Sequence, residues 1–333
     1  MTRIPRTVPV GCKLRRFDGS HTLGTRSHPP APARTERVES TAGVPTREHA
    51  LMPRISTPAG VEIEYDTFGS SSDPALLLVM GFTAQMTAWA PSFCDALAAG
   101  GLFVIRFDNR DCGLSSKFDG ATPATSGSYT LSEMSNDAFA LLRALGIEQA
   151  HIAGASMGGM IVQVMVIEHP ERVLSVTSIM STTGEADFGQ ATPEAIATLL
   201  TPPPTEREAY LDASKSRAIF MSKKYADLAK VRELAAASYD RSFYPEGAAR
   251  QMAAIMATGS RADGLRTLTA PMLVIHGLDD TLINPSGGRR TAELVPGARL
   301  LEVQDMGHDM PEPLWPAITS AIIEHTAAPV STA

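Results

Sequence analysis

Short apolar runs that alternate with helical patterns constrain the fold of this chain more than any other feature. The runs occupy residues 61–65, 75–80, 102–107, 151–153, 173–180, 271–275 and 298–303. Several of them, such as 75–80, 102–107 and 271–275, are apolar almost throughout, which is typical of strands in a parallel sheet that is covered on both faces. Helical patterns fill the gaps, at residues 87–99, 130–145, 157–169, 287–295 and 313–325. This alternation predicts an α/β fold with a doubly wound, mostly parallel sheet.

Residues 186–265 interrupt the alternation. They contain three consecutive prolines and then helical patterns at 206–238 and 246–257, with no strand-like run between them. A separate helical domain would fit this stretch alone, but the strands resume after it and need the earlier strands as partners. We therefore expect one domain at 52–330, with its core at 52–185 and 266–330 and an inserted helical cap at 186–265.

The first fifty residues differ in composition from the rest. They carry nine basic residues against four acidic ones, six prolines, and no run with the period of a strand or helix. Such a composition cannot bury enough apolar surface to offset the ordering of the chain, so residues 1–51 are predicted to be a disordered basic extension. Two other interpretations stay open: an organelle-targeting segment, because the stretch is rich in arginine, or a native start at Met52.

Composition argues against several classes of protein. The net charge is −7, and general nucleic-acid binding needs a basic face. Cys12, Cys94 and Cys112 are too few and too scattered for a disulfide framework or a zinc site. No apolar run reaches the roughly 18 residues of a transmembrane helix, and basic residues interrupt every candidate secretory signal. We therefore expect a cytoplasmic protein with no membrane span.

The strongest local signal is Gly154-Ala155-Ser156-Met157-Gly158, which matches the pattern G-x-S-x-G. It follows a strand-like run and precedes a helical pattern, which is the context in which this motif presents a nucleophile. The turn is crowded, so the positions two before and two after the serine need to be small, and both are glycine. The helix that follows points its N-terminus at the site and favours developing negative charge. Ser156 is therefore the predicted nucleophile.

A serine hydroxyl needs a base, and two of the eight histidines are candidates. Three others lie in the first fifty residues, and three lie where the predicted elements put them away from Ser156. His276 ends an apolar run and is interpreted as a packed turn residue. His308 lies in a loop after the last run, and active-site groups gather in loops at the carboxyl ends of such strands. His308 is therefore the predicted base.

The base needs a carboxylate to orient it, and the loop after residues 271–275 offers Asp279 and Asp280. Two adjacent side chains leave an extended loop in different directions, so only one of them can face His308. Asp187, after the run at 173–180, is a third candidate. The order Ser, Asp, His along the chain is the one that accompanies the G-x-S-x-G turn, and it fits either member of the adjacent pair.

Acyl transfer also needs two donors for the oxyanion of its tetrahedral intermediate. One candidate is the backbone N–H of Met157, immediately after Ser156. The other is the backbone N–H of Phe82, in the loop after residues 75–80. Because both act through the backbone, changing their side chains should matter less than changing Ser156.

These motifs resemble the α/β-hydrolase-fold serine esterases over about residues 55–327. Within that superfamily the chain resembles the aclacinomycin methylesterase group and related actinobacterial lipases and esterases. The segments that carry this resemblance are LLLVMGF, GGLFVIRFDNRDCGLSS, GASMGGMIVQ, PMLVIHGLDD and QDMGHDMPEPLW. The family's acid occupies the third position after the glycine of an H-G-x-x-D loop, which implies Asp280 here. Many relatives carry His-Gly before the oxyanion donor, where this chain has Met80-Gly81.

Three further features are interpreted mainly as structural. Arg110, in the charged loop 108–115, is expected to pair with a neighbouring aspartate rather than to take part in chemistry. Cys94 and Cys112 are expected to be packed thiols. A group of methionines is interpreted as core, with an adaptable apolar substrate pocket as the alternative: Met157, Met160, Met165, Met252 and Met256.

Taken together, the residues predict a serine hydrolase that cleaves a carboxylic ester of a small hydrophobic substrate through an acyl-enzyme, without a metal or cofactor. The resemblance implies either an ester on a bulky apolar skeleton or an ester with an acyl chain. The same three side chains would also serve a thioesterase, a lactonase, a carbon–carbon bond hydrolase or a perhydrolase. Two alternatives come from other classes: a non-catalytic protein that binds a small molecule, and a regulatory protein that uses the basic extension.

Overall fold

The structure is a computed structural model that describes residues 53–328. The predictions about residues 1–51 and about Met52 lie outside the described residues. The described residues all belong to one compact unit, which contains both the sheet and the helices inserted into it.

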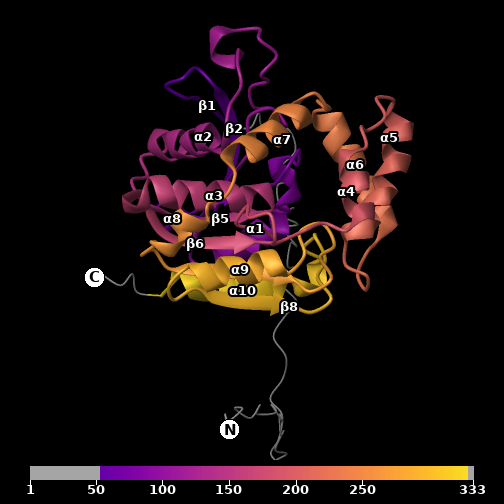
Figure 1. The fold of residues 1–333 in the computed structure, drawn as a ribbon. Helices are drawn as coiled ribbons and strands as arrows, with labels where there is room; N and C mark the ends of the chain where they lie inside the picture. The colour runs from indigo at the N-terminus through magenta and orange to yellow at the C-terminus, as the bar shows by residue number, and fades with distance from the viewer. Residues whose placement is uncertain (1–52, 329–333) are drawn as a thin grey trace, which may run out of the picture. The chain divides into compact units, whose positions relative to one another are not determined.

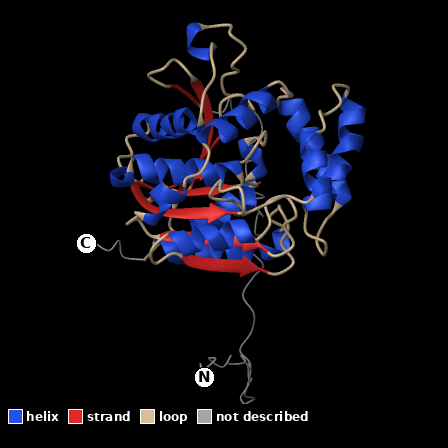
Figure 2. Ribbon diagram, in the orientation of Figure 1, coloured by secondary structure: helices blue, strands red, loops and turns tan. Residues whose placement is uncertain are grey.

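Within the described residues, eight strands form a single sheet (Figure 1, Figure 2). Their bounds are β1 Arg54–Ser56, β2 Glu62–Phe68, β3 Ala75–Val79, β4 Phe103–Phe107, β5 Ala150–Ala155, β6 Val173–Ile179, β7 Met272–Gly277 and β8 Arg299–Val303. The order across the sheet is β1-β2-β4-β3-β5-β6-β7-β8. Strand β2 pairs antiparallel with β1 and β4, and the other neighbouring pairs are parallel. The predicted doubly wound, mostly parallel sheet is therefore confirmed.

Helices alternate with the strands. The α-helices are α1 Pro91–Ala99, α2 Leu131–Ala144, α3 Met157–Glu168, α4 Pro193–Leu200, α5 Arg207–Ala213, α6 Leu228–Arg241, α7 Gly247–Thr258, α8 Ala262–Arg266, α9 Ser286–Leu294 and α10 Trp315–Thr326. The 3-10 turns are η1 Met86–Ala88, η2 Pro123–Thr125, η3 Pro170–Arg172, η4 Ser214–Phe220 and η5 Glu312–Leu314. Every helical pattern predicted outside the insertion coincides with a helix. Strand β1 was not predicted, because three residues are too few to show a period.

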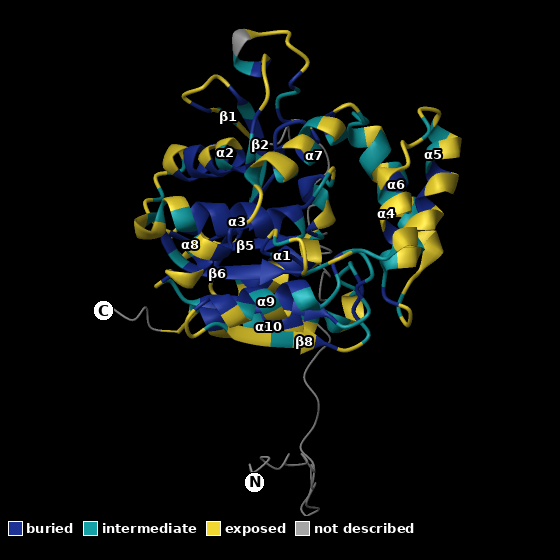
Figure 3. Ribbon diagram, viewed as in Figure 1, coloured by how far each residue is buried: buried dark blue, intermediate teal, exposed yellow. Residues whose placement is uncertain are grey.

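The core lies in two layers, one on each face of the sheet. Successive side chains of a strand point to opposite faces. Leu77 and Val79 of β3 therefore join one apolar cluster, to which α2, α3, α8 and α9 contribute. Leu76 and Leu78 join the other, to which α1 and α10 contribute. Because both faces are covered, every residue of β3, β4 and β5 is buried, which explains the apolar runs. Figure 3 shows the strand β6 of the same sheet in the colour of buried residues.

Along the chain, helices α4 to α8 follow β6 and precede β7, and none of the described strands falls within 180–271. The arrows of β6 and β8 point toward the side on which α4, α5 and α6 lie (Figure 1), so these helices lie beyond the carboxyl ends of the strands. The short helix α8 instead packs into the core, where Leu265 is fully buried.

The helical pattern over 206–238 corresponds to three separate elements, α5, η4 and α6, rather than to one helix. After η4 the backbone N–H of Ser222 donates to Oδ1 of Asp309, at 2.8 Å, in the loop after β8. Helix α6 then begins at Leu228, after its N-cap Asp227, whose carboxylate accepts from the N–H of Ala229. A contact with a distant loop therefore accompanies the end of η4, and a local cap accompanies the start of α6.

Candidate active site

Ser156 lies at the sharp turn between β5 and α3, with φ of 57° and ψ of −119°. A non-glycine residue with positive φ is uncommon, and such strained residues cluster at functional sites. The surrounding backbone is tightly packed. A Cβ at position 154 would lie 2.1 Å from the carbonyl oxygen of Gly158, and one at position 158 would lie 2.1 Å from that of Val79. Neither position has room for a side chain, as the crowded-turn argument predicts.

A hydrogen-bonded chain joins three of the predicted site residues. Nε2 of His308 lies 2.9 Å from Oγ of Ser156, and Nδ1 of His308 lies 2.7 Å from Oδ2 of Asp280. The carboxylate can only accept, so Nδ1–H donates to it and Nε2 is left to accept from the serine hydroxyl. Ser156 follows β5, Asp280 follows β7 and His308 follows β8. The carboxyl ends of these parallel strands share one edge of the sheet, which brings together residues that are far apart in sequence.

Asp280 is buried and fully hydrogen-bonded. Its Oδ1 accepts from the backbone N–H groups of Leu282 and Ile283, both at 2.9 Å, while Oδ2 faces His308. Burial by itself would raise the pKa of Asp280. The attraction of His308, with hydrogen bonds from His276 and His308, outweighs burial and holds the pKa below its ordinary value. The carboxylate therefore stays ionised and can stabilise a positively charged imidazole.

None of the rival candidates takes the place of Asp280 or His308, although Nε2 of His276 lies 3.5 Å from Oδ2 of Asp280. Asp279 is half-buried and Asp187 is exposed, and among the described residues neither carboxylate bonds to His308. His276 is buried inside β7 rather than in the turn after it. Its Nε2 lies 2.7 Å from the carbonyl oxygen of Ile283, so it braces the loop that carries Asp280.

The two N–H groups predicted to bind an oxyanion lie on segments beside Ser156. Met157 is the first residue of α3, where backbone N–H groups have no partner within the helix. Gly81 precedes Phe82 and packs against the nucleophile, since a Cβ at position 81 would lie 3.0 Å from Cβ of Ser156. Within residues 53–328, neither the Phe82 nor the Met157 amide donates to a protein acceptor, so both can bind an oxygen of a ligand.

Comparison with known proteins places this arrangement in a family. A family model for the alpha/beta hydrolase fold matches residues 74–312. The chain belongs to this family. Rhodomycin D methylesterase DauP of Streptomyces sp. (strain C5) is 30% identical, and DnrP of Streptomyces peucetius is 29% identical, each over 83% of this chain and 98% of its own length. The solved structure of the enol-lactonase from Burkholderia xenovorans LB400 has a TM-score of 0.66 at 24% identity, over 83% of this chain and 100% of that one. The predicted fold and the predicted family resemblance are confirmed.

In this hydrolase the inserted segment 219–222 touches the loops that follow β7 and β8. The carbonyl oxygen of Phe220 accepts from the backbone N–H of His308 at 2.6 Å, and the Phe220 ring lies edge-on to the imidazole, with centroids 6.3 Å apart. The carbonyl oxygen of Ile219 accepts from Oγ1 of Thr281 at 2.9 Å. Sequence reasoning missed this segment, because a helical pattern does not indicate which distant loop a residue will contact.

Arg110 of the hydrolase pairs with an aspartate, as expected, and that aspartate is distant in the sequence. Its guanidinium forms a buried bidentate pair with Asp137 of α2, with bonds of 2.6 and 2.8 Å, rather than with an aspartate of its own loop. The adjacent Asp111 pairs instead with Arg250 of α7, at 2.8 and 2.9 Å. Two ion pairs therefore join the loop after β4 to α2, which precedes the insertion in the chain, and to α7, which belongs to the insertion.

The predicted packing of the two described cysteines is confirmed, since Cys94 and Cys112 are buried. Burial, with repulsion from Asp108, raises the pKa of Cys112 to about 12, so this thiol stays protonated at neutral pH. Several of the methionines lie in the core, as expected: Met157, Met160 and Met165. Met256 is 74% exposed, so the interpretation as core is wrong for this residue.

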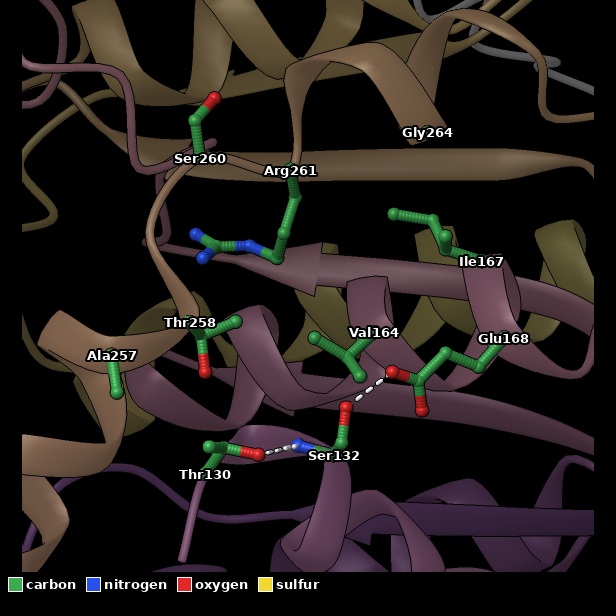
Figure 4. Close-up of a pocket in the computed structure, with 10 residues that line it drawn as sticks. All are labelled: Thr130, Ser132, Val164, Ile167, Glu168, Ala257, Thr258, Ser260, Arg261 and Gly264. Carbon is green, nitrogen blue, oxygen red and sulfur yellow. Dashed lines mark hydrogen bonds between the residues drawn. The ribbon is translucent and has the colours of Figure 1, made fainter.

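A surface hollow of about 370 Å³ lies beside α2, α3 and the segment from α7 to α8 (Figure 4). The guanidinium of Arg261 lines it, but this group already donates to Oε1 of Gln163 and to two backbone carbonyl oxygens. Glu168, also at the hollow, accepts from the hydroxyl of Ser132. None of the three side chains of the hydrogen-bonded chain lines this hollow, so it is separate from the candidate active site.

Residues 53–328 lack two further features. No group of three or more His, Cys, Asp or Glu side chains is placed to hold a metal ion. No helix in the same range is both long enough and apolar enough to cross a membrane.

Proposed function

We propose that this protein is a carboxylic ester hydrolase with Ser156 as nucleophile, His308 as general base and Asp280 as the carboxylate that orients the base. The observation that carries the proposal is the continuous hydrogen-bonded chain from the serine hydroxyl through the imidazole to the carboxylate. A hydroxyl in such a chain can pass on its proton as it attacks. The methylesterase relatives support ester hydrolysis as the reaction.

Acylation begins when Oγ of Ser156 attacks the ester carbonyl carbon and Nε2 of His308 takes its proton. Asp280 holds the imidazole by Nδ1 and stabilises its positive charge. The N–H groups of Phe82 and Met157 bind the oxyanion of the tetrahedral intermediate. The bond from the carbonyl carbon to the alkoxy oxygen then breaks, and His308 gives its proton to the departing alcohol.

Deacylation repeats these steps with water. His308 takes a proton from water, whose oxygen attacks the acyl carbon while the same two N–H groups bind the new oxyanion. The bond to Oγ of Ser156 breaks, and the serine recovers its proton from His308. One ester and one water are consumed, and one acid and one alcohol are formed.

For the substrate we propose a methyl ester on a bulky apolar skeleton. Two methylesterases that each match this chain over 98% of their own length support that class. An ester with an apolar acyl chain is the second candidate within the same chemistry. A screen of p-nitrophenyl esters of increasing acyl length, beside aromatic methyl esters, thioesters and lactones, decides among these classes by kcat/KM.

Replacing Ser156 by alanine tests the reaction itself. We expect Ser156→Ala to lower kcat on a short p-nitrophenyl ester by about 10⁴- to 10⁶-fold, because the nucleophile is lost while the binding groups remain. Ser175→Ala removes a buried hydroxyl from the neighbouring strand β6 and serves as the matched control, with activity retained. Unchanged circular dichroism shows that each variant folds. Full turnover by folded Ser156→Ala would overturn the proposal.

A fluorophosphonate probe separates a catalyst from a non-catalytic binder. A serine activated by a base reacts with the phosphorus centre and becomes covalently modified. We expect one label per chain, mapped to Ser156 by mass spectrometry. A folded protein that binds hydrophobic esters but takes up no label would instead be a binding protein.

A further inference from the structure

The loop that carries Phe82 has an unusual backbone. The next residue, Thr83, has φ of 57°, a left-handed conformation that is a marked outlier for a β-branched side chain. Such strain persists only where the surroundings hold it. The loop lies against the nucleophile through Gly81, so whatever holds Thr83 also controls the direction of the Phe82 N–H.

Gln251 of the inserted helix α7 holds this residue. Its side chain is fully buried, and its Oε1 accepts from the backbone N–H of Thr83 at 2.8 Å. Its Nε2 donates to the carbonyl oxygen of Arg110 at 2.9 Å, in the loop after β4. One amide group therefore links the loop that carries Phe82 to the loop after β4, and both of its ends are used.

The neighbours of Gln251 keep it in place. Arg250, the preceding residue on α7, forms two hydrogen bonds with buried Asp111 in the loop after β4. Two residues after Thr83, Gln85 is buried and its Nε2 donates to the carbonyl oxygens of Ser238 and Ser242, at 2.7 and 2.9 Å. The inserted helices therefore form hydrogen bonds with the loop after β3 at two residues, Thr83 and Gln85.

We propose that Gln251 is a positioning residue that aims the Phe82 N–H at the oxyanion. This inference rests on the proposed function, because it needs Phe82 to be an oxyanion donor. The N–H groups of Phe82 and Thr83 are separated only by the backbone rotations φ and ψ of Phe82. If the Thr83 N–H loses its acceptor, the Phe82 N–H can therefore rotate away from the oxyanion. A misdirected donor weakens binding of the transition state more than binding of the ester, so kcat falls while KM changes little.

The test compares Gln251→Met, which has similar length but no polar group, with Gln163→Met. Gln163 is a fully buried glutamine on α3 whose partners are Arg261 and Ser178, so its loss measures the general cost of removing a buried amide. We expect Gln251→Met to lower kcat by about 10- to 100-fold with little change in KM. We expect Gln163→Met to keep kcat within about twofold of the unsubstituted protein, even if its Tm is lower.

Two further measurements separate aiming of the donor from general damage. An aryl trifluoromethyl ketone forms a tetrahedral adduct with the serine that carries an oxyanion, so its inhibition constant should rise by the same factor as kcat/KM falls. Gln251→Glu keeps an oxygen that accepts from the Thr83 N–H, and we expect it to retain more of kcat than Gln251→Met. If Gln251→Met does not fold, Gln251→Asn takes its place, because its amide is one methylene too short to bridge Thr83 and Arg110.

The outcomes distinguish this inference from the proposed function. Folded Gln251→Met with kcat within about twofold of normal, or with only KM raised, would overturn the positioning role. So would an inhibition constant that stays constant while kcat falls. Full activity in Ser156→Ala would instead remove the proposed function on which the inference rests.

Discussion

Asp279 and Asp280 are adjacent and carry the same side chain, but their surroundings differ. Asp280 is buried, with one oxygen facing His308 and the other accepting two backbone N–H groups. Asp279 is half-buried, and its backbone N–H donates to the carbonyl oxygen of Met306. The loop thus brings the Asp280 carboxylate to the base, while among the described residues the Asp279 carboxylate forms no bond to it.

Replacing each of these carboxylates by its amide should therefore give opposite results. We expect Asp280→Asn to lower kcat by about 10⁴-fold, since the imidazole loses the acceptor that fixes its tautomer and stabilises its charge. Asp279→Asn, the matched control, should keep kcat within about threefold. Steady-state kinetics on one ester measures both. Equal losses in the two variants would show that the Asp280 carboxylate has no special part in the reaction.

At the scale of elements, the turn from β5 to α3 depends on close backbone contact. The missing side chains of Gly154 and Gly158 let β3, β5 and the start of α3 approach one another. The inserted helices then act on both sides of this turn: the segment 219–222 contacts the loops after β7 and β8, and α7 holds the loop after β3. The insertion is bonded to several of the loops that form the candidate site.

A side chain at the turn should be costly. We expect Gly158→Ala to lower the free energy of unfolding by about 3 kcal/mol or more, because its Cβ would meet backbone rather than a side chain that can move. Gly146 has φ of 74° and open space around it, so Gly146→Ala should cost only the left-handed conformation, about 1 kcal/mol. Urea unfolding measures both. A smaller loss in Gly158→Ala than in Gly146→Ala would contradict the crowded-turn argument.

At the scale of the whole molecule, stability should depend on histidines that the reaction does not use. Nδ1 of His151, in β5, lies 2.8 Å from Oγ of Ser175. Burial, with the nearby charge of His325, lowers the pKa of His151 to about 4 from its ordinary 6.5. Between these two values the unfolded chain binds a proton that the folded chain does not, so stability falls as the pH falls through this window.

Removing this histidine should flatten that dependence. We expect the free energy of unfolding of His151→Gln to fall less between pH 6.5 and pH 4 than that of the unsubstituted protein. His169→Gln is the control, because it removes a histidine whose side chain is 43% exposed rather than buried. Urea unfolding across this pH range gives the comparison. An unchanged slope in His151→Gln would assign the acid sensitivity to other groups.

The features that the sequence predicts well are those set by local physics. Apolar runs arise because each central strand is covered on both faces, so strand and helix could be read along the chain and the α/β fold followed. The G-x-S-x-G turn can also be recognised from five consecutive residues, although part of its crowding comes from Val79 of β3. The division of residues 206–238 into separate helices could not be predicted from local pattern, because it is accompanied by a hydrogen bond from Ser222 to a loop about ninety residues later.

By itself, the sequence determined the fold class, the nucleophile turn and the two strand ends from which an acid and a base would come. It did not decide between Asp279 and Asp280 except through resemblance to a family, because the path of the loop sets which carboxylate faces His308. Nothing in a helical pattern marked Gln251, whose two partners lie more than a hundred residues away. The tertiary structure decided these points, because a hydrogen bond depends on positions that only the packed backbone brings within about 3 Å.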